Sequence, residues 1–297
     1  MTNQTQMMEF LLMRFTENWE TQILHSVLFL LIYLVALLGN LLIITLIIKD
    51  HRLHMPMYFF LKNLSFLDLC LISITVPKSI TNSLMNCNTI SFPGCVCQVF
   101  FFFLLATTEI ALLTVMSYDR YVAICHPLRY EVIMSHEACA QMAVSSWVSG
   151  SLNAILHTAC TFSVPMCGFP EVHHFFCDIP QLLSLACSYN TGELVITGLN
   201  LVLDFGCFVF IDISYIHIFF TVLRMPSKEG KSKAFSTCLP HLIVVTLFFS
   251  SGFFAYLRPL PKSPSPLDLL VSVFYTVMPP TLNPFIYSLR NKDMKMA

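Results

Sequence analysis

The sequence has few charged residues, with Asp, Glu, Lys and Arg making up 11% of its 297 residues against roughly a quarter in an ordinary soluble domain. Hydrophobic residues make up 56%, and a soluble fold could not keep that much apolar surface away from water. The net charge of -1 also argues against nucleic-acid binding, which calls for a basic surface. We therefore expect a protein whose solvent is a lipid bilayer.

Several motifs of catalysis and metal binding are also missing. There is no GxSxG or HExxH spacing for a hydrolase, no CxxC pair for a metal and no internal repeat of the kind that transporters use. We therefore expect no enzyme, no cofactor and no resident metal site. An ion-conducting protein stays open as an alternative, because acidic residues inside apolar stretches could line an ion path; these are Asp68, Glu109, Asp204 and Asp212.

Long apolar runs are what the chain does contain. A helix that crosses a bilayer needs about 20 mostly apolar residues, and seven stretches qualify: 24–48, 57–80, 95–117, 138–158, 194–223, 235–257 and 267–289. The fourth is the least apolar. We expect an all-α membrane protein with one seven-helix domain over 1–297, made of an outer segment (1–23), a helix bundle (24–289) and a short tail (290–297).

The basic residues predict which way the bundle faces. Twelve of the 16 Lys and Arg residues fall at one side of the predicted spans, and basic residues collect in the cytoplasm. The amino terminus is then extracellular and the carboxyl terminus cytoplasmic. Asn3 begins an Asn-Gln-Thr glycosylation sequon on the outer side. The expected location is the plasma membrane, crossed several times.

Twelve cysteines raise the question of disulfides, which persist outside the cell. Cys95 begins the third span, and Cys167, Cys177 and Cys187 lie in the long outer loop between the fourth and fifth spans. We predict that Cys95 pairs with Cys177 and that Cys167 pairs with Cys187. Free cysteines are the alternative, because connectivity does not follow from sequence alone.

Acidic residues in the spans are costly and usually face the bundle interior. On the third span, Glu109 shares one helical stripe with Phe102, Ala106 and Arg120, so this carboxyl group points inward. Asp68 and Glu109 are then both candidates for the interior, where they would bind a cation such as sodium or share a proton. For Asp204 and Asp212, hydrogen-bonded interior or interfacial acids are at least as good an interpretation as a functional site.

Short motifs stand in order at the proper ends of the predicted spans: Gly39-Asn40; Pro56-Met57-Tyr58-Phe59-Phe60-Leu61; Leu64-Ser65-Phe66-Leu67-Asp68; Met116-Ser117-Tyr118-Asp119-Arg120-Tyr121; Ser214-Tyr215; Lys233-Ala234-Phe235-Ser236-Thr237-Cys238; and Pro280-Thr281-Leu282-Asn283-Pro284-Phe285-Ile286-Tyr287. This ordered set, which runs over nearly the whole chain, resembles the motifs of the odorant-receptor family within the rhodopsin-like G-protein-coupled receptors.

This resemblance implies roles for the matching residues. Asn40, Asp68, Glu109 and Asn283 resemble a polar core that couples the ligand pocket to the cytoplasmic end. Arg120 resembles the arginine that meets the G protein, restrained by Asp119 in the off state and accompanied by Tyr121, Tyr215 and Tyr287. A heterotrimeric G protein, stimulatory and raising cyclic AMP, is the implied partner, and the cilia of olfactory neurons are the implied location. A non-olfactory receptor of the same fold is the nearest alternative.

In such relatives the ligand lies between the outer halves of the third, fifth, sixth and seventh spans. The positions offered here are aromatic, aliphatic or neutral polar: Phe102, Phe103, Ala106, Thr107, Leu199, Asn200, Phe253, Tyr256 and Thr276. The seventh span has no lysine for a retinal Schiff base, and we expect no acid near Phe102 to pair with an amine. The implied ligand is a small, mostly apolar, neutral volatile molecule with one hydrogen-bonding group, although each aromatic side chain taken singly serves core packing equally well.

The chain departs from the family pattern in a few places. Phe249 stands where many relatives have tyrosine, and Pro240 where many have serine. Asp204 and Asp212 stand where apolar residues are expected, and the short tail offers no cysteine for palmitoylation.

Overall fold

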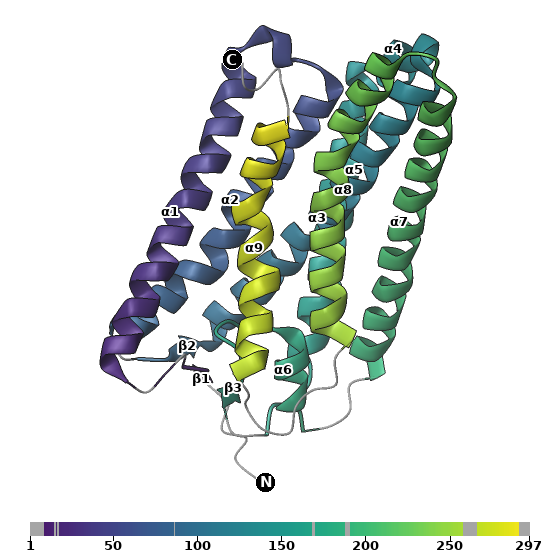
Figure 1. Cartoon of the computed structure of the whole chain (residues 1–297). Coiled ribbons are helices and arrows are strands. Elements are labelled where there is room, and N and C mark those ends of the chain that lie inside the picture. Colours follow the sequence, from purple (N-terminus) through teal and green to yellow (C-terminus); the bar gives the residue numbers. More distant parts are fainter. Residues whose placement is uncertain are drawn as a thin grey trace.

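The computed structural model describes residues 9–14, 16, 18–85, 87–167, 170–187, 191–257 and 266–290. The predicted glycosylation site at Asn3 and most of the predicted tail lie outside these residues. Seven long helices form an upright bundle (Figure 1): α1 (Trp19–Lys49), α2 (Pro56–Leu84), α3 (Phe92–Cys125), α5 (His136–Phe162), α7 (Thr191–Arg224), α8 (Lys228–Leu257) and α9 (Pro266–Arg290). Each predicted span falls within one of them, so the seven-helix fold is confirmed.

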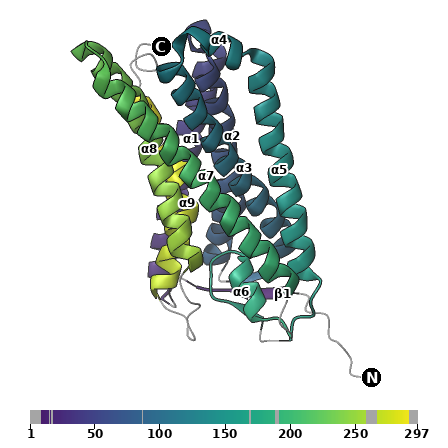
Figure 2. The ribbon, with the colours of Figure 1, turned by 90° about the vertical axis from the view of Figure 1, so that its right-hand side faces the viewer.

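Short elements connect the long helices. They are η1 (His51–Leu53), η2 (Pro127–Arg129), α4 (Tyr130–Ile133) and α6 (Ile179–Ser184), with strands β1 (Glu9–Leu12), β2 (Thr89–Ser91) and β3 (Glu171–Val172). The strands and α6 gather at one end of the bundle, while α4 lies at the other (Figures 1 and 2). We refer to the end with the strands as the outer end, because the predicted extracellular segments lie there.

Local sequence explains where several helices begin. Side-chain oxygens of Asn18, Ser91 and Ser135 accept hydrogen bonds from backbone N–H groups in the first turns of α1, α3 and α5. These N–H groups have no partner inside the helix, so a capping side chain stabilises the first turn. Proline stands in the first turn of α2 and α3, where its missing donor costs nothing.

The outer surface of the bundle is apolar. Leu38 is 62% exposed on α1 and Leu203 is 64% exposed on α7, an arrangement that only lipid can solvate. Among the described residues, α1, α2, α3, α7 and α8 are apolar and long enough by composition to cross a membrane. The other two long helices, α5 and α9, pack in the same bundle (Figure 1).

A small lid closes the outer end. Its sheet has the order β2-β1-β3, with β1 antiparallel to β2 and parallel to β3. Phe10 of β1 is fully buried in a cluster with Ile90, Val172 and Leu182, so an apolar core fixes the strand register. Both predicted disulfides form: Cys95–Cys177 ties the lid to α3, and Cys167–Cys187 closes the loop on itself.

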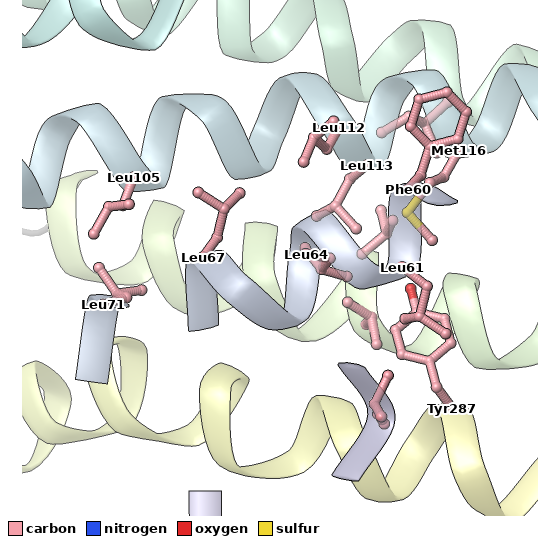
Figure 3. Close-up of a cluster of buried hydrophobic side chains, with 14 of the residues drawn as sticks. Phe60, Leu61, Leu64, Leu67, Leu71, Leu105, Leu112, Leu113, Met116 and Tyr287 are labelled. Atoms are coloured by element: carbon pink, nitrogen blue, oxygen red, sulfur yellow. The ribbon is translucent and has the colours of Figure 1, made fainter. Parts of the chain in front are cut away.

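The interior of the bundle is packed by leucines and aromatic residues from α2, α3 and α9. Leu64, Leu67 and Leu112 are completely buried, and Figure 3 shows them between these helices together with Met116 and Tyr287. Dense packing of this kind holds the helices at fixed spacings, which is what positions the polar groups described below.

Two glycines allow helices to approach closely. A Cβ atom at Gly150 of α5 would lie 2.1 Å from the Thr108 Oγ1 atom and 2.6 Å from the Leu104 carbonyl oxygen of α3. A Cβ atom at Gly39 of α1 would lie 2.9 Å from the Pro284 Cβ atom of α9. Small residues at such crossings are typical of membrane helix bundles.

Candidate functional site

A buried acid lies in the lid, directly after the cysteine that is bound to α3. Asp178 accepts hydrogen bonds from the Tyr256 hydroxyl of α8 at 3.0 Å and the Tyr275 hydroxyl of α9 at 2.5 Å. The His174 Nδ1 atom lies 3.4 Å from the same carboxylate. Asp178 therefore connects the lid to the outer ends of α8 and α9.

The Asp178 carboxylate corrects one prediction. The Tyr275 ring also contacts the Phe102 ring, with centroids 6.1 Å apart, so an acid does lie close to the predicted pocket. The sequence concealed it because Asp178 belongs to the loop rather than to any span. Phe176 of the same loop contacts both rings, with its ring centroid 5.3 Å from that of Phe102 and 6.1 Å from that of Tyr275. These aromatic side chains cover the interior of the bundle at its outer end.

A second group of predicted residues surrounds His157 of α5. The Phe103 ring lies over His157 with centroids 4.5 Å apart. The His157 Nδ1 atom lies 2.6 Å from the Glu193 carboxylate, and its Nε2 atom lies 2.6 Å from the Asn200 amide nitrogen. A neutral histidine with its proton on Nδ1 satisfies both contacts, donating to Glu193 and accepting from Asn200.

Four further residues predicted to contact the ligand lie in different surroundings. Thr107 accepts a hydrogen bond from Asn153 at 2.7 Å, on the side of the His157 group. Thr276 is fully buried in α9 and bonds to the Ser272 carbonyl oxygen. Ala106 is half-buried on α3, and Phe253 packs against Phe249 and Phe208.

Leu199 does not join the other predicted ligand residues. It is 60% exposed on the surface of α7, and its predicted place among the pocket residues is wrong. Successive residues of a helix are rotated by about 100°, so the neighbour of an inward Asn200 faces the lipid.

Three of the four predicted polar-core residues make hydrogen bonds between helices. The Asn283 amide of α9 donates to both oxygens of Asp68 of α2, at 3.2 and 3.0 Å. The Asn40 amide donates to the Pro280 carbonyl oxygen at 2.9 Å. Pro284 has no N–H to offer that carbonyl four residues earlier, so Asn40 supplies the donor that the helix lacks.

The fourth member, Glu109, is fully buried, and its carboxyl oxygens make no hydrogen bond of good geometry with any described residue, although the Asn283 amide lies near them. Glu109 lies close enough to Asp68 for the two groups to interact electrostatically. Unpartnered buried oxygens are rare and call for an explanation. The carboxyl groups of Asp68 and Glu109 supply the hard oxygen ligands that suit an alkali cation, and a shared proton would satisfy the same atoms.

At the inner end of α3, Arg120 forms a salt bridge with the carboxylate of the adjacent Asp119. Asp119 is fully buried, and its second oxygen accepts a hydrogen bond from the Tyr130 hydroxyl of α4 at 2.7 Å. Burial and the neighbouring Asp119 carboxylate raise the pKa of Tyr130, so its hydroxyl keeps its proton. Asp119 therefore restrains Arg120 through the salt bridge, and the Tyr130 hydroxyl fixes the position of Asp119.

The three predicted tyrosines of the switch do not touch Arg120 through hydrogen bonds. The Tyr215 hydroxyl lies 2.7 Å from the His241 Nδ1 atom, and the His241 Nε2 atom donates to the Leu113 carbonyl oxygen at 3.1 Å. His241 of α8 thus joins α7 to α3. Tyr121 bonds to His126 at 3.1 Å, and the buried Tyr287 hydroxyl has no hydrogen-bond partner in the part of the chain that the structure describes.

Sequence reasoning missed four residues that these groups depend on: Tyr130, His157, Asp178 and His241. Only Asp178 carried a usable signal, because the predicted Cys95–Cys177 bond places the next residue over the outer end of α3. Within the described residues no cluster of three His, Cys, Asp or Glu side chains could hold a metal ion.

Comparison with known proteins agrees with these features. The family model described as "Olfactory receptor" matches residues 29–297. Olfactory receptor 14A16 of Homo sapiens is 60% identical over 298 residues, spanning 100% of this chain and 96% of its own length. Olfactory receptor 14J1 of Homo sapiens is 56% identical, spanning 100% and 93%. The crystal structure of squid rhodopsin has a TM-score of 0.74 at 19% identity, covering 94% of this chain and 80% of that one, so the fold is shared with it.

Proposed function

Because the chain belongs to the olfactory receptor family and has the fold of rhodopsin, we propose that it binds a small, mostly apolar volatile molecule in the outer half of the bundle and activates a heterotrimeric G protein. It is a multi-pass membrane receptor and not an enzyme. The G protein is of the stimulatory kind that raises cyclic AMP, and the receptor acts in the plasma membrane of olfactory cilia.

One observation carries this proposal. A single helix, α3, presents Phe102 and Phe103 at its outer half and the Asp119–Arg120 salt bridge at its inner end. A ligand that alters the packing around the first pair can shift the equilibrium at the second, because packed helices change between discrete arrangements.

The aromatic cluster around Phe102 and the polar contacts around His157 both favour a small, mostly apolar ligand. Phe102, Phe176 and Tyr275 offer aromatic surface for an apolar body. His157 and Asn200 offer hydrogen bonding for one polar group. Apolar walls with a few directed polar groups are the usual composition of small-molecule sites.

The contacts at the inner end of the bundle are those expected for a receptor in its off state. Arg120 is engaged by Asp119, and Tyr215 is engaged by His241 of α8. An outward movement of α8 would break the second contact and free Tyr215 to join Tyr287 in supporting Arg120 as it meets the G protein. Asp68 and Glu109 would hold a sodium ion or a proton in the off state, since two neighbouring buried carboxyl groups favour a cation or a shared proton between them.

The test is a cyclic-AMP response to a panel of volatile compounds in transfected cells. Against an agonist so found, Phe102→Ala should raise the half-maximal concentration by about tenfold or more, in the range of buried contact residues. Phe101→Ala is the matched control, because Phe101 is 46% exposed on the neighbouring face. Arg120→Ala should abolish the response at equal surface expression.

Two results would overturn the proposal. An undiminished response in Arg120→Ala would remove Arg120 from G-protein coupling. Equal potencies for Phe101→Ala, Phe102→Ala, Asn200→Ala and Tyr256→Phe would remove the ligand from the outer half of the bundle.

A further inference from the structure

A groove lies between the inner halves of α7 and α8, two helices that stand on the side of the bundle away from α1 (Figure 1). Its volume is about 450 Å³, and its walls include Tyr215, Ile216 and Phe219 of α7 with Phe235 and Leu242 of α8. This volume falls in the range of about 300 to 1,000 Å³ that small-molecule sites occupy.

Asp212 also lines this groove, where it is an ionisable residue among mostly apolar ones. It is exposed on α7 and makes no hydrogen bond or ion pair with any described residue. It stands twelve residues before Arg224, the last residue of α7, which is about 18 Å along the helix axis. Asp212 also lies inside the apolar span predicted over 194–223, and a polar group within a membrane span needs a partner.

Asp212 differs in this respect from Asp68, whose carboxylate has the Asn283 amide inside the bundle. A partner for Asp212 has to come from the lipid side. Phospholipid head groups stay at the membrane surface, so their donors do not reach this depth. A carboxyl group accepts a hydrogen bond in either protonation state but donates one only when it is protonated. A hydrogen-bond donor on a molecule that dissolves in the bilayer is therefore the partner that suits Asp212 in both states.

We propose that the groove binds a small, apolar, neutral alcohol from the lipid phase, whose hydroxyl donates to Asp212 and whose carbon skeleton packs against Ile216, Phe219 and Phe235. This site is separate from the outer ligand pocket. Because Tyr215 lines the groove and its hydroxyl bonds to His241, an occupant touches the contact that joins α7 to α8. The alcohol therefore acts as a modulator of the α8 movement.

The experiment uses the full-length receptor in cell membranes and two photoreactive probes. One probe is a medium-chain alcohol carrying a diazirine, and the other is its analogue without the hydroxyl. After irradiation, labelled peptides of α7 and α8 are measured by mass spectrometry. We expect the alcohol to label the groove at least about fivefold more than the analogue, the discrimination that one hydrogen bond gives.

A swap variant, Asp212→Ile with Ile213→Asp, is the matched control. It keeps the carboxyl at the same depth but turns it by about 100° out of the groove, and it should reduce alcohol labelling to the level of the analogue. If the swap lowers surface expression, Ile216→Trp provides a second variant, since it fills the groove from an exposed position and should abolish labelling by both probes.

Equal labelling by the two probes in the unaltered receptor would overturn the proposal. So would a preference for the alcohol that survives the swap. Crosslinking of two receptor chains through position 212 would also overturn it, because a second copy would then be what covers Asp212.

Discussion

Replacing Tyr130 by phenylalanine should raise the activity of the receptor in the absence of any odorant. The Tyr130 hydroxyl donates to Asp119 at 2.7 Å, and Asp119 in turn holds Arg120. The substitution removes one oxygen atom and leaves the ring in place, so only the hydrogen bond is lost. An Asp119 with one partner fewer restrains Arg120 less.

The size of the effect follows from the nature of the bond. A hydrogen bond to a charged group contributes about 1.5–3 kcal/mol. Tyr130 is half-buried, so water can replace part of what it provides, and the lower end of about 1.5 kcal/mol applies. If the off state alone has this bond, the ratio of on to off rises about tenfold. The raised pKa of Tyr130 keeps the hydroxyl protonated across physiological pH, so the difference between variant and parent should not depend on pH there.

The assay is agonist-free cyclic AMP in transfected cells, normalised to the amount of receptor at the surface. Tyr118→Phe is the matched control, because it is the same chemical change at a hydroxyl for which the structure gives no hydrogen bond within the described chain. Adding Arg120→Ala to Tyr130→Phe should return the signal to background. A basal signal equal in Tyr130→Phe and Tyr118→Phe would refute the restraint, and so would an increase that persists without Arg120.

Three further predictions concern the packing and the polar groups of the bundle. Gly150→Ala should destabilise the receptor by about 1–3 kcal/mol through overpacking, visible as a lower melting temperature, whereas Gly206→Ala, with open space around it, should be neutral or slightly stabilising; equal melting temperatures would contradict the close α3–α5 crossing. Tyr275→Phe removes a donor from the buried Asp178 and should cost about 1.5–3 kcal/mol, measured as the same thermal shift, and an unchanged melting temperature would mean that this bond contributes nothing. Glu109→Gln should abolish any dependence of agonist potency on sodium concentration, and a sodium effect of unaltered size would place the cation elsewhere.

The helices of this protein could be predicted from sequence because a bilayer imposes a simple rule. Each crossing must be long, apolar and helical, and all seven stretches can be recognised in the sequence, including α5, in which polar residues dilute the apolar run. The two disulfides were proposed from where the outer cysteines stand, but their connectivity became known only once the loop was placed against α3. Leu199 was misplaced because its side of α7 depends on helix rotation, which an almost uniformly apolar helix does not reveal.

The polar contacts were predictable only in part. Asp68 and Asn283 stand in motifs, and a carboxyl group inside a membrane needs a partner, so their meeting could be anticipated. His241 and Tyr130 could not, because a single histidine or loop tyrosine carries no periodic signal and gains its meaning from residues more than ten positions away. The sequence shows that Pro284 has no N–H, so the Pro280 carbonyl oxygen needs another hydrogen-bond donor. That Asn40 is this donor becomes known only once the structure places α1 beside α9.

The lid has a consequence for how the two ends of the molecule communicate. Asp178 joins it to Tyr256 at the outer end of α8, while His241 joins the inner half of α8 to α3 and α7. Influence between two such sites is reciprocal, so whatever loosens α8 from below must change how firmly a guest is held above. A G protein at the inner face should therefore tighten the hold on an agonist by the same factor as the agonist tightens the hold on the G protein.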